Sequence, residues 1–466
     1  MEEIILLHTN DLHSHFENWP KIRRFLLNKR KENSTPKQST FVVDLGDFVD
    51  RWHPLTEATN GTANVELMNA VHYDGATIGN NEGVGNSKKQ LNHLYDEANF
   101  DILLGNLFDL DTGKRPRWAL PYKILATAQK TRVGLIGLTA PFPLTYKPNG
   151  WDIRGVDDVL PQLISEVRQQ CDVLILLSHL GIDNDMKIAT NYPEIDVLLG
   201  SHTHHLFRHG EKINHTQLSA AGKFGQYVGE VHLLLEDGVI VQTSAEALPT
   251  EDFLALPEDE AEISSYLEKG HDLLKQKQVA DLPYTFSNVL DSEHPLIFQA
   301  LNALKKRGGT EAAVLNTGLF LDDLSKGLVT EENLHQVLPH PMHLIRVTLN
   351  GKELTRLVRE MEKNRHFLRK FPIVGMGFRG KIFGDISYTG ISYDKADASV
   401  YWNGQAVVDN QNYTLTTIDH YLFIPFFPTI EIAGEIEFLF PEFLRNVFGD
   451  YLRRCYPIDK KATYNK

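Results

Sequence analysis

The sequence predicts a two-domain α/β protein: a layered sheet in the first half, then a smaller domain that mixes helices and strands. Two observations lead to this prediction. The chain has 466 residues, more than a single hydrophobic core usually holds. Up to about residue 245, short apolar runs alternate with longer polar and partly helical stretches. With 42% apolar and 23% charged residues, the composition is that of an ordinary globular protein.

Seven apolar runs in the first half have the length of buried strands, and several are rich in Val and Ile. They are Ile4–Leu7, Phe41–Val43, Ala76–Ile78, Ile102–Leu104, Val133–Leu138, Val173–Leu177 and Val197–Leu199. A helix expected within Val156–Gln170 carries Val156, Val159, Leu160, Leu163 and Val167 on one face. Strands that alternate with amphipathic helices are typical of an α/β sheet covered by helices.

The pattern changes after residue 247. Pro249 and Pro257 flank an acidic segment that leads into a predicted helix through Leu267 and Leu274, which is typical of a connector between domains. We therefore expect a first domain at residues 1–247, a connector helix within 248–277 and a second domain at 278–466. In the second domain we expect helices around residues 296–306 and 350–362 and strands at Ala313–Leu315 and Leu344–Leu349.

The charge and the ends of the sequence restrict the possible partners. A net charge of −14 argues against nucleic acid and anionic membranes, because both need a positive protein surface. A small phosphorylated substrate stays compatible, because bound metal ions supply positive charge locally. The first residues show no signal-peptide pattern, and no apolar run is long enough to span a bilayer, so we expect a cytoplasmic protein.

Residues that bind metals follow five of the predicted strands. They are Asp11 and His13, Asp47, Asn80, His179, and His202 with His204. In α/β sheets ligands collect at the carboxyl ends of the strands, so we expect these side chains to converge.

This set of residues suits two divalent ions. Two ions about 3.5–4 Å apart can clamp both the attacking and the leaving oxygen of a displacement at phosphorus. One carboxylate must bridge them, and Asp47, which follows a glycine just past a strand, is the natural bridge. In Asp11-x-His13 and His202-x-His204, alternate residues of an extended segment would point the same way.

Each residue also has an ordinary explanation. A single Asp or His in a loop is usually solvated, and Asp11 or Asp47 alone would serve as a turn former or a helix N-cap. Several histidines near the N-terminus are unremarkable in a chain with 20 of them. The recurrence of the same strand-to-loop position five times favours a metal site.

These segments also carry a resemblance. The string from Leu7 to His15 resembles the opening motif of the 5′-nucleotidase family within the calcineurin-like metallophosphoesterases. Similar to its other blocks, in the same order, are Gly46-Asp47, Gly79-Asn80, Ser178–Gly181 and Gly200–His204. The resemblance spans about residues 4–245. It implies a four-layer αββα sandwich with two facing sheets, followed by a smaller α+β substrate-binding domain.

The resemblance also implies the ligand sets. One metal would be held by Asp11, His13, Asp47 and His204, and the other by Asp47, Asn80, His179 and His202. A metal-bound hydroxide would then attack phosphorus in line. The identity of the two divalent ions stays open among Mn, Zn, Mg and Fe.

The sequence departs from the family pattern in the third block. Asn81 stands where the family carries its catalytic histidine. Asparagine donates a hydrogen bond but supplies no proton at neutral pH. Three alternatives stay open: slow turnover of alkyl phosphates, a substitute acid (His15, His205 or Glu82), or a substrate that needs no acid.

The second half resembles the family's nucleotide-binding domain only faintly. Leu315–Gly318 resembles the start of an Asn-x-Gly-Gly-Ile-Arg block, but its arginine position falls on Leu321. Candidates for substrate contacts are Asn316, Phe378 and Tyr421, with Arg379 for a phosphate. Aromatic side chains that simply fill the core explain Phe378 and Tyr421 equally well.

We therefore expect a divalent-metal-dependent phosphohydrolase that acts on nucleotides or nucleotide-like phosphoesters or phosphoanhydrides. The enzymatic alternative is a cyclic-nucleotide phosphodiesterase. The alternative from another class is a metal-loaded binding protein that lost catalysis together with the histidine.

Overall fold

The computed structural model describes residues 1–32, 35–373, 375 and 377–458. The chain forms two compact units, Met1–Gly270 and His271–Lys466, and their boundary falls within helix α9 (Asp259–Lys275). This is the helix that the sequence predicts through Leu267 and Leu274. In the described part of the chain, no helix is both long enough and apolar enough to cross a bilayer.

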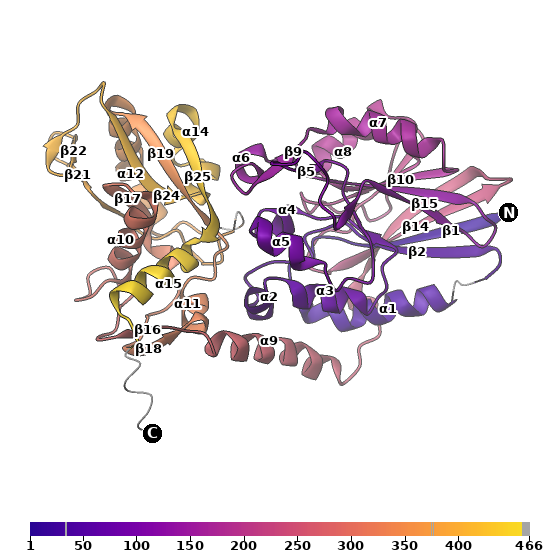
Figure 1. The fold of residues 1–466 in the computed structure, drawn as a ribbon, viewed down its shortest axis with the longest axis horizontal. Coiled ribbons are helices and arrows are strands. Elements are labelled where there is room, and N and C mark those ends of the chain that lie inside the picture. Colours follow the sequence, from indigo (N-terminus) through magenta and orange to yellow (C-terminus); the bar gives the residue numbers. More distant parts are fainter. Residues whose placement is uncertain (33–34, 374, 376, 459–466) are drawn as a thin grey trace. The chain divides into compact units, whose positions relative to one another are not determined.

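The first unit contains two large sheets (Figure 1). The seven-stranded sheet has the order β15 (Val239–Pro249), β14 (Tyr227–Glu236), β1 (Glu2–Thr9), β2 (Gln38–Asp44), β3 (Gly75–Ala76), β4 (Ile102–Leu103) and β6 (Ala119–Leu120). The six-stranded sheet has the order β12 (Glu211–Ile213), β13 (Thr216–Ser219), β11 (Val197–Gly200), β10 (Val173–His179), β8 (Arg132–Thr139) and β7 (Tyr122–Ala126).

Alternation of side chains along the strands builds the layers. Ile4 and Leu6 of β1 belong to an apolar cluster with residues of β8, β10 and β11, so they face the other sheet. Ile5 and Leu7 point the opposite way and pack with α1 (Trp19–Glu32), α3 (Thr62–Asn69) and α5 (Lys88–Leu94). This is the two-residue period of a strand buried on both faces.

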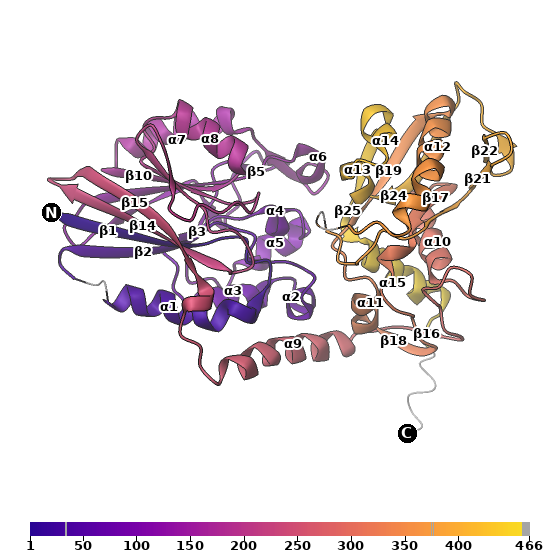
Figure 2. The same cartoon turned by 180° about the vertical axis from the view of Figure 1, so that it is seen from behind.

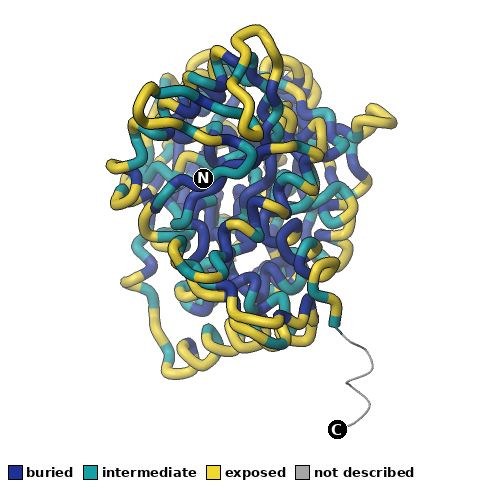
Figure 3. The backbone as a smooth tube through the Cα atoms, turned by 90° about the vertical axis from the view of Figure 1, so that its left-hand side faces the viewer, coloured by how far each residue is buried: buried dark blue, intermediate teal, exposed yellow. Residues whose placement is uncertain are grey.

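The second sheet is covered in the same way. Helices α7 (Val156–Arg168) and α8 (Ile182–Asn191) pack on the outer face of β8, β10 and β11, on the opposite side of the two sheets from α1 (Figure 2). In Figure 3 buried residues gather toward the centre of the view, and many of the exposed residues lie in the outer segments. The expected four-layer αββα sandwich is therefore confirmed.

Strand direction places the candidate ligands. β1, β2, β3 and β4 run parallel, as do β8, β10 and β11. The segments after β1, β2 and β3 carry Asp11, Asp47 and Asn80, whereas His179 ends β10 and His202 follows β11. All these positions lie at the carboxyl ends of parallel strands, where α/β sheets form their binding sites.

The second unit is a separate α+β domain. Its five-stranded sheet has the order β20 (Ile386–Thr389), β17 (Ala312–Asn316), β24 (Asn412–Ile418), β19 (His343–Asn350) and β25 (Glu435–Phe443). Helices α10 (Leu296–Gly308), α12 (Gly351–Leu368) and α15 (Leu444–Cys455) contribute side chains to its single apolar core. The helices and strands that the sequence predicts for this half are present.

Candidate metal centre

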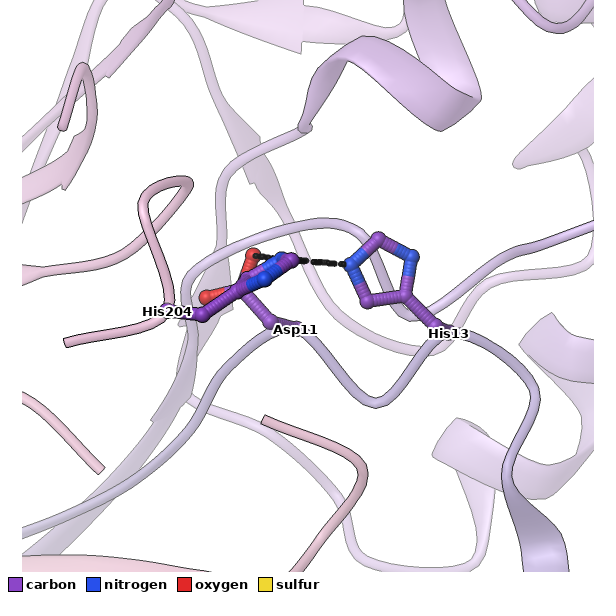
Figure 4. A group of neighbouring side chains, drawn as sticks. All are labelled: Asp11, His13 and His204. Atoms are coloured by element: carbon purple, nitrogen blue, oxygen red, sulfur yellow. Dashed lines mark hydrogen bonds and ion pairs between the residues drawn. The ribbon is translucent and has the colours of Figure 1, made fainter. Parts of the chain in front are cut away.

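All seven candidate ligands lie in one cluster of the first unit. Asp11, His13 and His204 offer ligand atoms within 4.8 Å of one another, and so do Asp11, Asp47 and His179. In Figure 4 the carboxylate of Asp11 and the rings of His13 and His204 point toward one another. Asn80 and His202 complete the cluster next to His179, at 3.4 Å (Asn80 Oδ1 to His179 Nε2) and 5.1 Å between ring centres.

Asp47 belongs to the second group and also lies close to the first. Its Oδ2 is 3.4 Å from His179 Nε2 and 3.7 Å from His13 Nε2. Asp11 belongs to both groups, and its Oδ1 is 3.7 Å from His204 Nε2. The Nε2 atoms of His13 and His204 face each other at 3.0 Å, as two imidazoles would that share one cation.

The backbone that carries these side chains is left-handed. Five of the seven candidates have positive φ: Asp11 (49°), His13 (51°), Asp47 (53°), His202 (75°) and His204 (57°). Such conformations are uncommon outside glycine and cost about 1–3 kcal/mol each. The expectation of extended Asp11-x-His13 and His202-x-His204 segments is therefore wrong, because tight left-handed turns aim these side chains instead. Strain concentrated in this way is typical of functional sites.

Surrounding groups hold the cluster in place. The Nδ1 of His179 lies 2.8 Å from the carbonyl oxygen of Leu45, so a hydrogen on Nδ1 donates there and Nε2 keeps its lone pair for a metal. The carboxylate of Glu82 accepts hydrogen bonds from the backbone N–H groups of Gly79, Asp47 and Val49, at 2.8, 3.0 and 2.9 Å. Glu82, one of the three possible substitute acids, thus anchors the two loops that carry Asp47 and Asn80.

The electrostatics fit a divalent cation. Asp11 and Asp47 are both buried, and two buried carboxylates this close need a compensating positive charge. Burial, together with the positive charge of nearby groups, lowers the pKa of His202 to about 4 and that of His204 to about 3. Both rings are therefore neutral near pH 7, the form that coordinates metals. Against the effect of burial, neighbouring carboxylates raise the pKa of His13 and raise that of His179 to about 10, so a bound metal ion would have to displace a proton from these two rings. Carboxylate oxygens and neutral imidazoles together form a donor set suited to Zn, Mn or Fe.

Asn81 lies at the edge of this cluster. Its backbone N–H donates to Asp47 Oδ1 at 2.8 Å. Its side-chain nitrogen lies 2.9 Å from Nδ1 of His13 and 3.1 Å from the carbonyl oxygen of Val49. Asn81, which we expect to stand at the position of the family's histidine, therefore contacts a candidate ligand directly.

The candidates in the second unit have partners of their own. Asn316 is buried, and its amide contacts the carbonyl of Phe383 and the hydroxyl of Tyr421, which is also buried. Phe378 stacks against His340, with ring centres 5.1 Å apart, and the backbone N–H of Arg379 donates to His340 Nδ1. The role of Asn316, Phe378, Arg379 and Tyr421 in substrate binding stays a prediction.

Comparisons with known proteins follow the same division. The sequence model of the calcineurin-like phosphoesterase family matches residues 4–206, and the family model of the 5′-nucleotidase C-terminal domain matches residues 279–423. A Bacillus subtilis protein described as an uncharacterized metallophosphoesterase, YunD, is 36% identical over 96% of this chain and 98% of its own length. The chain belongs to the calcineurin-like metallophosphoesterases. It carries, in addition, the C-terminal domain of 5′-nucleotidases.

Two further relatives share both units. The 5′-nucleotidase of Vibrio cholerae is 22% identical over 76% of this chain and 74% of its own length. The NAD nucleotidase of Haemophilus influenzae, a solved structure, has a TM-score of 0.65 at 16% identity and covers 97% of this chain, with 96% of its own chain matched. At 16% identity, this structural similarity shows only that the two chains share a fold. As a calcineurin-like metallophosphoesterase, the chain is a metal-dependent phosphoesterase.

Gly79 is a sensitive position in this metallophosphoesterase. A Cβ atom at Gly79 would collide with Oδ1 of Asp47 and with Cε1 of His179. We expect Gly79→Ala to displace Asp47, to lower the metal content, and to reduce activity by roughly 10²-fold, as misplacement of reacting groups by about 1 Å does. Elemental analysis measures the metal content, and turnover of an aryl phosphate measures the activity. Gly113→Ala is the control, because it strains a backbone with φ of 64° but its methyl group meets no atom within 4 Å. An equal loss in both variants would contradict the prediction.

Proposed function

We propose that this metallophosphoesterase is a two-metal phosphohydrolase that acts on nucleotides or nucleotide-like phosphoesters and phosphoanhydrides. The observation that carries the proposal is Asp47, whose carboxylate lies within 3.7 Å of imidazoles of both ligand groups. One ion would be held by Asp11, His13, Asp47 and His204, and the other by Asp47, Asn80, His179 and His202.

The chain's own residues would prepare the site for this reaction. Bound divalent ions would supply positive charge for the phosphoryl-transfer transition state and make a water molecule nucleophilic. Asp47 would fix the spacing of the two positions, and Glu82 would hold the loops of Asp47 and Asn80 through three backbone hydrogen bonds. Leu45 would orient the ring of His179. A site held in this way needs little reorganisation during the reaction.

The substrate class rests on the second unit. Residues 278–466 would form the substrate-binding domain and residues 1–247 the metal-binding domain, with 248–277 as the connector. The match to the 5′-nucleotidase C-terminal domain and the nucleotide-hydrolysing activities named for the relatives support a nucleotide-like substrate. Arg379 and Phe378 are our candidates to meet its phosphate and its base.

A hydrolysis screen tests the proposal. The full-length protein is incubated with an aryl phosphate, nucleoside mono- and polyphosphates, dinucleotides, sugar nucleotides and cyclic nucleotides, each with Mn²⁺, Zn²⁺ or Mg²⁺. We expect metal-dependent release of phosphate or of a nucleotide, abolished by EDTA and restored by the metal. Preference for cyclic nucleotides would indicate a phosphodiesterase instead. Metal binding with no turnover of any substrate would identify a binding protein.

A further inference from the structure

The segment Ala221–Gly225 joins β13 to β14 and is tied to both metal-binding loops. The Asn10 side chain, next to Asp11, donates to the carbonyl of Gly222 at 2.8 Å and accepts from the N–H of Ala221 at 3.3 Å. The N–H of Phe224 donates to the carbonyl of Asp11 at 2.8 Å, and that of Gly222 donates to the carbonyl of His205 at 3.0 Å. This segment is therefore held rigidly against the cluster from two sides.

The same segment has a strained backbone. Gly222, Phe224 and Gly225 have φ values of 68°, 60° and 62°. For a bulky residue such as Phe224 this conformation is a genuine outlier, which persists only where the surrounding structure imposes it. The strain turns the ring of Phe224 toward the metal cluster, where its centre lies 5.9 Å from that of His13 and 6.4 Å from that of His204.

The side chain of Lys223 packs against this ring. Its Nζ lies 4.5 Å from the centre of the Phe224 ring, within the range of a cation–π contact. Among the described residues, no carboxylate forms an ion pair with Lys223. Lys223 is partly buried, and an ammonium group near a centre proposed to bind phosphate, without a carboxylate partner among the described residues, is suited to an anionic group of the substrate.

Asn81 and the ring that carries Lys223 lie near the same candidate ligand. The side-chain nitrogen of Asn81 is 2.9 Å from Nδ1 of His13, and the ring of Phe224 has its centre 5.9 Å from that of His13. The position of the absent acid and the ring under Lys223 are therefore both close to His13.

We propose that Lys223 binds the leaving group of a phosphoanhydride substrate through an oxygen of its second phosphate. This inference rests on the proposed function and names the substrate class that the site favours. Hydrolysis forms a bond between a water oxygen and phosphorus and breaks the bond from phosphorus to the bridging oxygen. The bridging oxygen leaves with the electron pair as part of a phosphate oxyanion, and the proton of the water passes to solvent.

A leaving phosphate is a weak base, so it needs a countercharge more than it needs a proton. The ammonium group of Lys223 provides this charge without any proton transfer. The substitution of the family's histidine by Asn81 and the presence of Lys223 then have one common explanation: the site serves anhydrides.

Lys223→Met tests the assignment, with Lys212→Met on the edge strand β12 as the control that removes an equal charge. Both variants are compared with the wild-type protein, with Mn²⁺, on ADP and on p-nitrophenyl phosphate, which has no second phosphate. We expect Lys223→Met to lower kcat/KM for ADP about 10-fold more than that for p-nitrophenyl phosphate. Lys223→Arg should restore part of the loss. Equal losses on the two substrates, or no loss, would overturn the inference.

Binding to the Mn²⁺-loaded protein separates this inference from the proposed function. Lys223→Met should reduce the preference for inorganic pyrophosphate over inorganic phosphate about 10-fold, measured by calorimetry. If no substrate is turned over but this preference falls, the proposed function fails and Lys223 stays a pyrophosphate-binding residue. If turnover is metal-dependent and the preference does not change, the proposed function stands and the role of Lys223 is refuted.

Discussion

Asp47→Asn is expected to abolish hydrolysis and to lower the metal content of both positions at once. The reason is geometric, because Oδ2 of Asp47 lies 3.4 Å from Nε2 of His179 and 3.7 Å from Nε2 of His13, which belong to different ligand groups. Loss of one group that stabilises transition-state charge already lowers a rate by about 10²–10³-fold. Loss of a carboxylate that serves two ions should lower the rate by more than this.

Two variants make the test of Asp47 specific. Asp111→Asn changes the charge equally at a carboxylate that is 83% exposed, and it should leave metal content and rate unchanged. His204→Ala should weaken chiefly one of the two ions, because His204 belongs only to the group of Asp11 and His13. Two tightly bound metals per chain in Asp47→Asn, measured by elemental analysis, would show that another residue bridges them.

The apolar runs were sufficient to predict a sheet covered by helices, whereas the two facing sheets of the sandwich followed only from the family resemblance. Runs such as Ile4–Leu7 and Val173–Leu177 are apolar on both faces, as strands buried between two layers are. Parallel strands then bring their carboxyl ends to one edge, so Asp11, Asp47 and His179 meet although they are far apart in the sequence.

The sequence did not reveal how the side chains are aimed. The expected extended segments placed Asp11 close to His13 for the wrong reason, because both residues have positive φ. They did not predict the neighbours of His204, which lies with Asp11 and His13, whereas His202 lies next to His179. Non-glycine residues adopt positive φ only when surrounding contacts impose it, and those contacts come from segments distant in sequence. Gly46, next to Asp47, and Gly200, two residues before His202, were the available signal, but glycine alone does not show which nearby residue is strained.

Contacts with the backbone were also missed. Glu82, which the sequence offers as a possible acid, accepts backbone hydrogen bonds from Gly79, Asp47 and Val49 through its two oxygens, and its role as an acid stays a prediction. Lys223 lies in a connection between two strands with no motif of its own. Its proximity to the centre depends on Asn10, whose amide holds the backbone of Gly222. Such contacts follow from the tertiary fold and leave no periodic pattern in the sequence.

The second large effect is expected at Asn81, and it depends on the leaving group. A nucleoside 5′-oxygen leaves as a strongly basic alkoxide, whose departure benefits greatly from protonation, whereas a phosphate leaving from an anhydride is already a weak base. Asparagine supplies no proton, and general acid catalysis contributes about 10²–10⁴-fold. We therefore expect the wild-type protein to hydrolyse phosphoanhydrides, such as dinucleotides, sugar nucleotides or nucleoside polyphosphates, faster than AMP.

Asn81→His should raise the hydrolysis of AMP selectively, by roughly 10-fold or more. The side chain already lies 2.9 Å from His13 Nδ1, so an imidazole at this position starts at the edge of the centre. Asn81→Gln is the matched control, because it keeps an amide and adds no proton donor, and it should give no gain on AMP. The comparison is kcat for AMP against kcat for ADP, with metal content measured in each variant.

If the wild-type protein prefers AMP and Asn81→His leaves that rate unchanged, the acid is present elsewhere, and alanine substitutions of His15, His205 and Glu82 would identify it. Among these variants, Glu82→Ala should also lose metal, since Glu82 anchors the loops of Asp47 and Asn80. A variant that removes the true acid should instead lose AMP hydrolysis and keep its metal content.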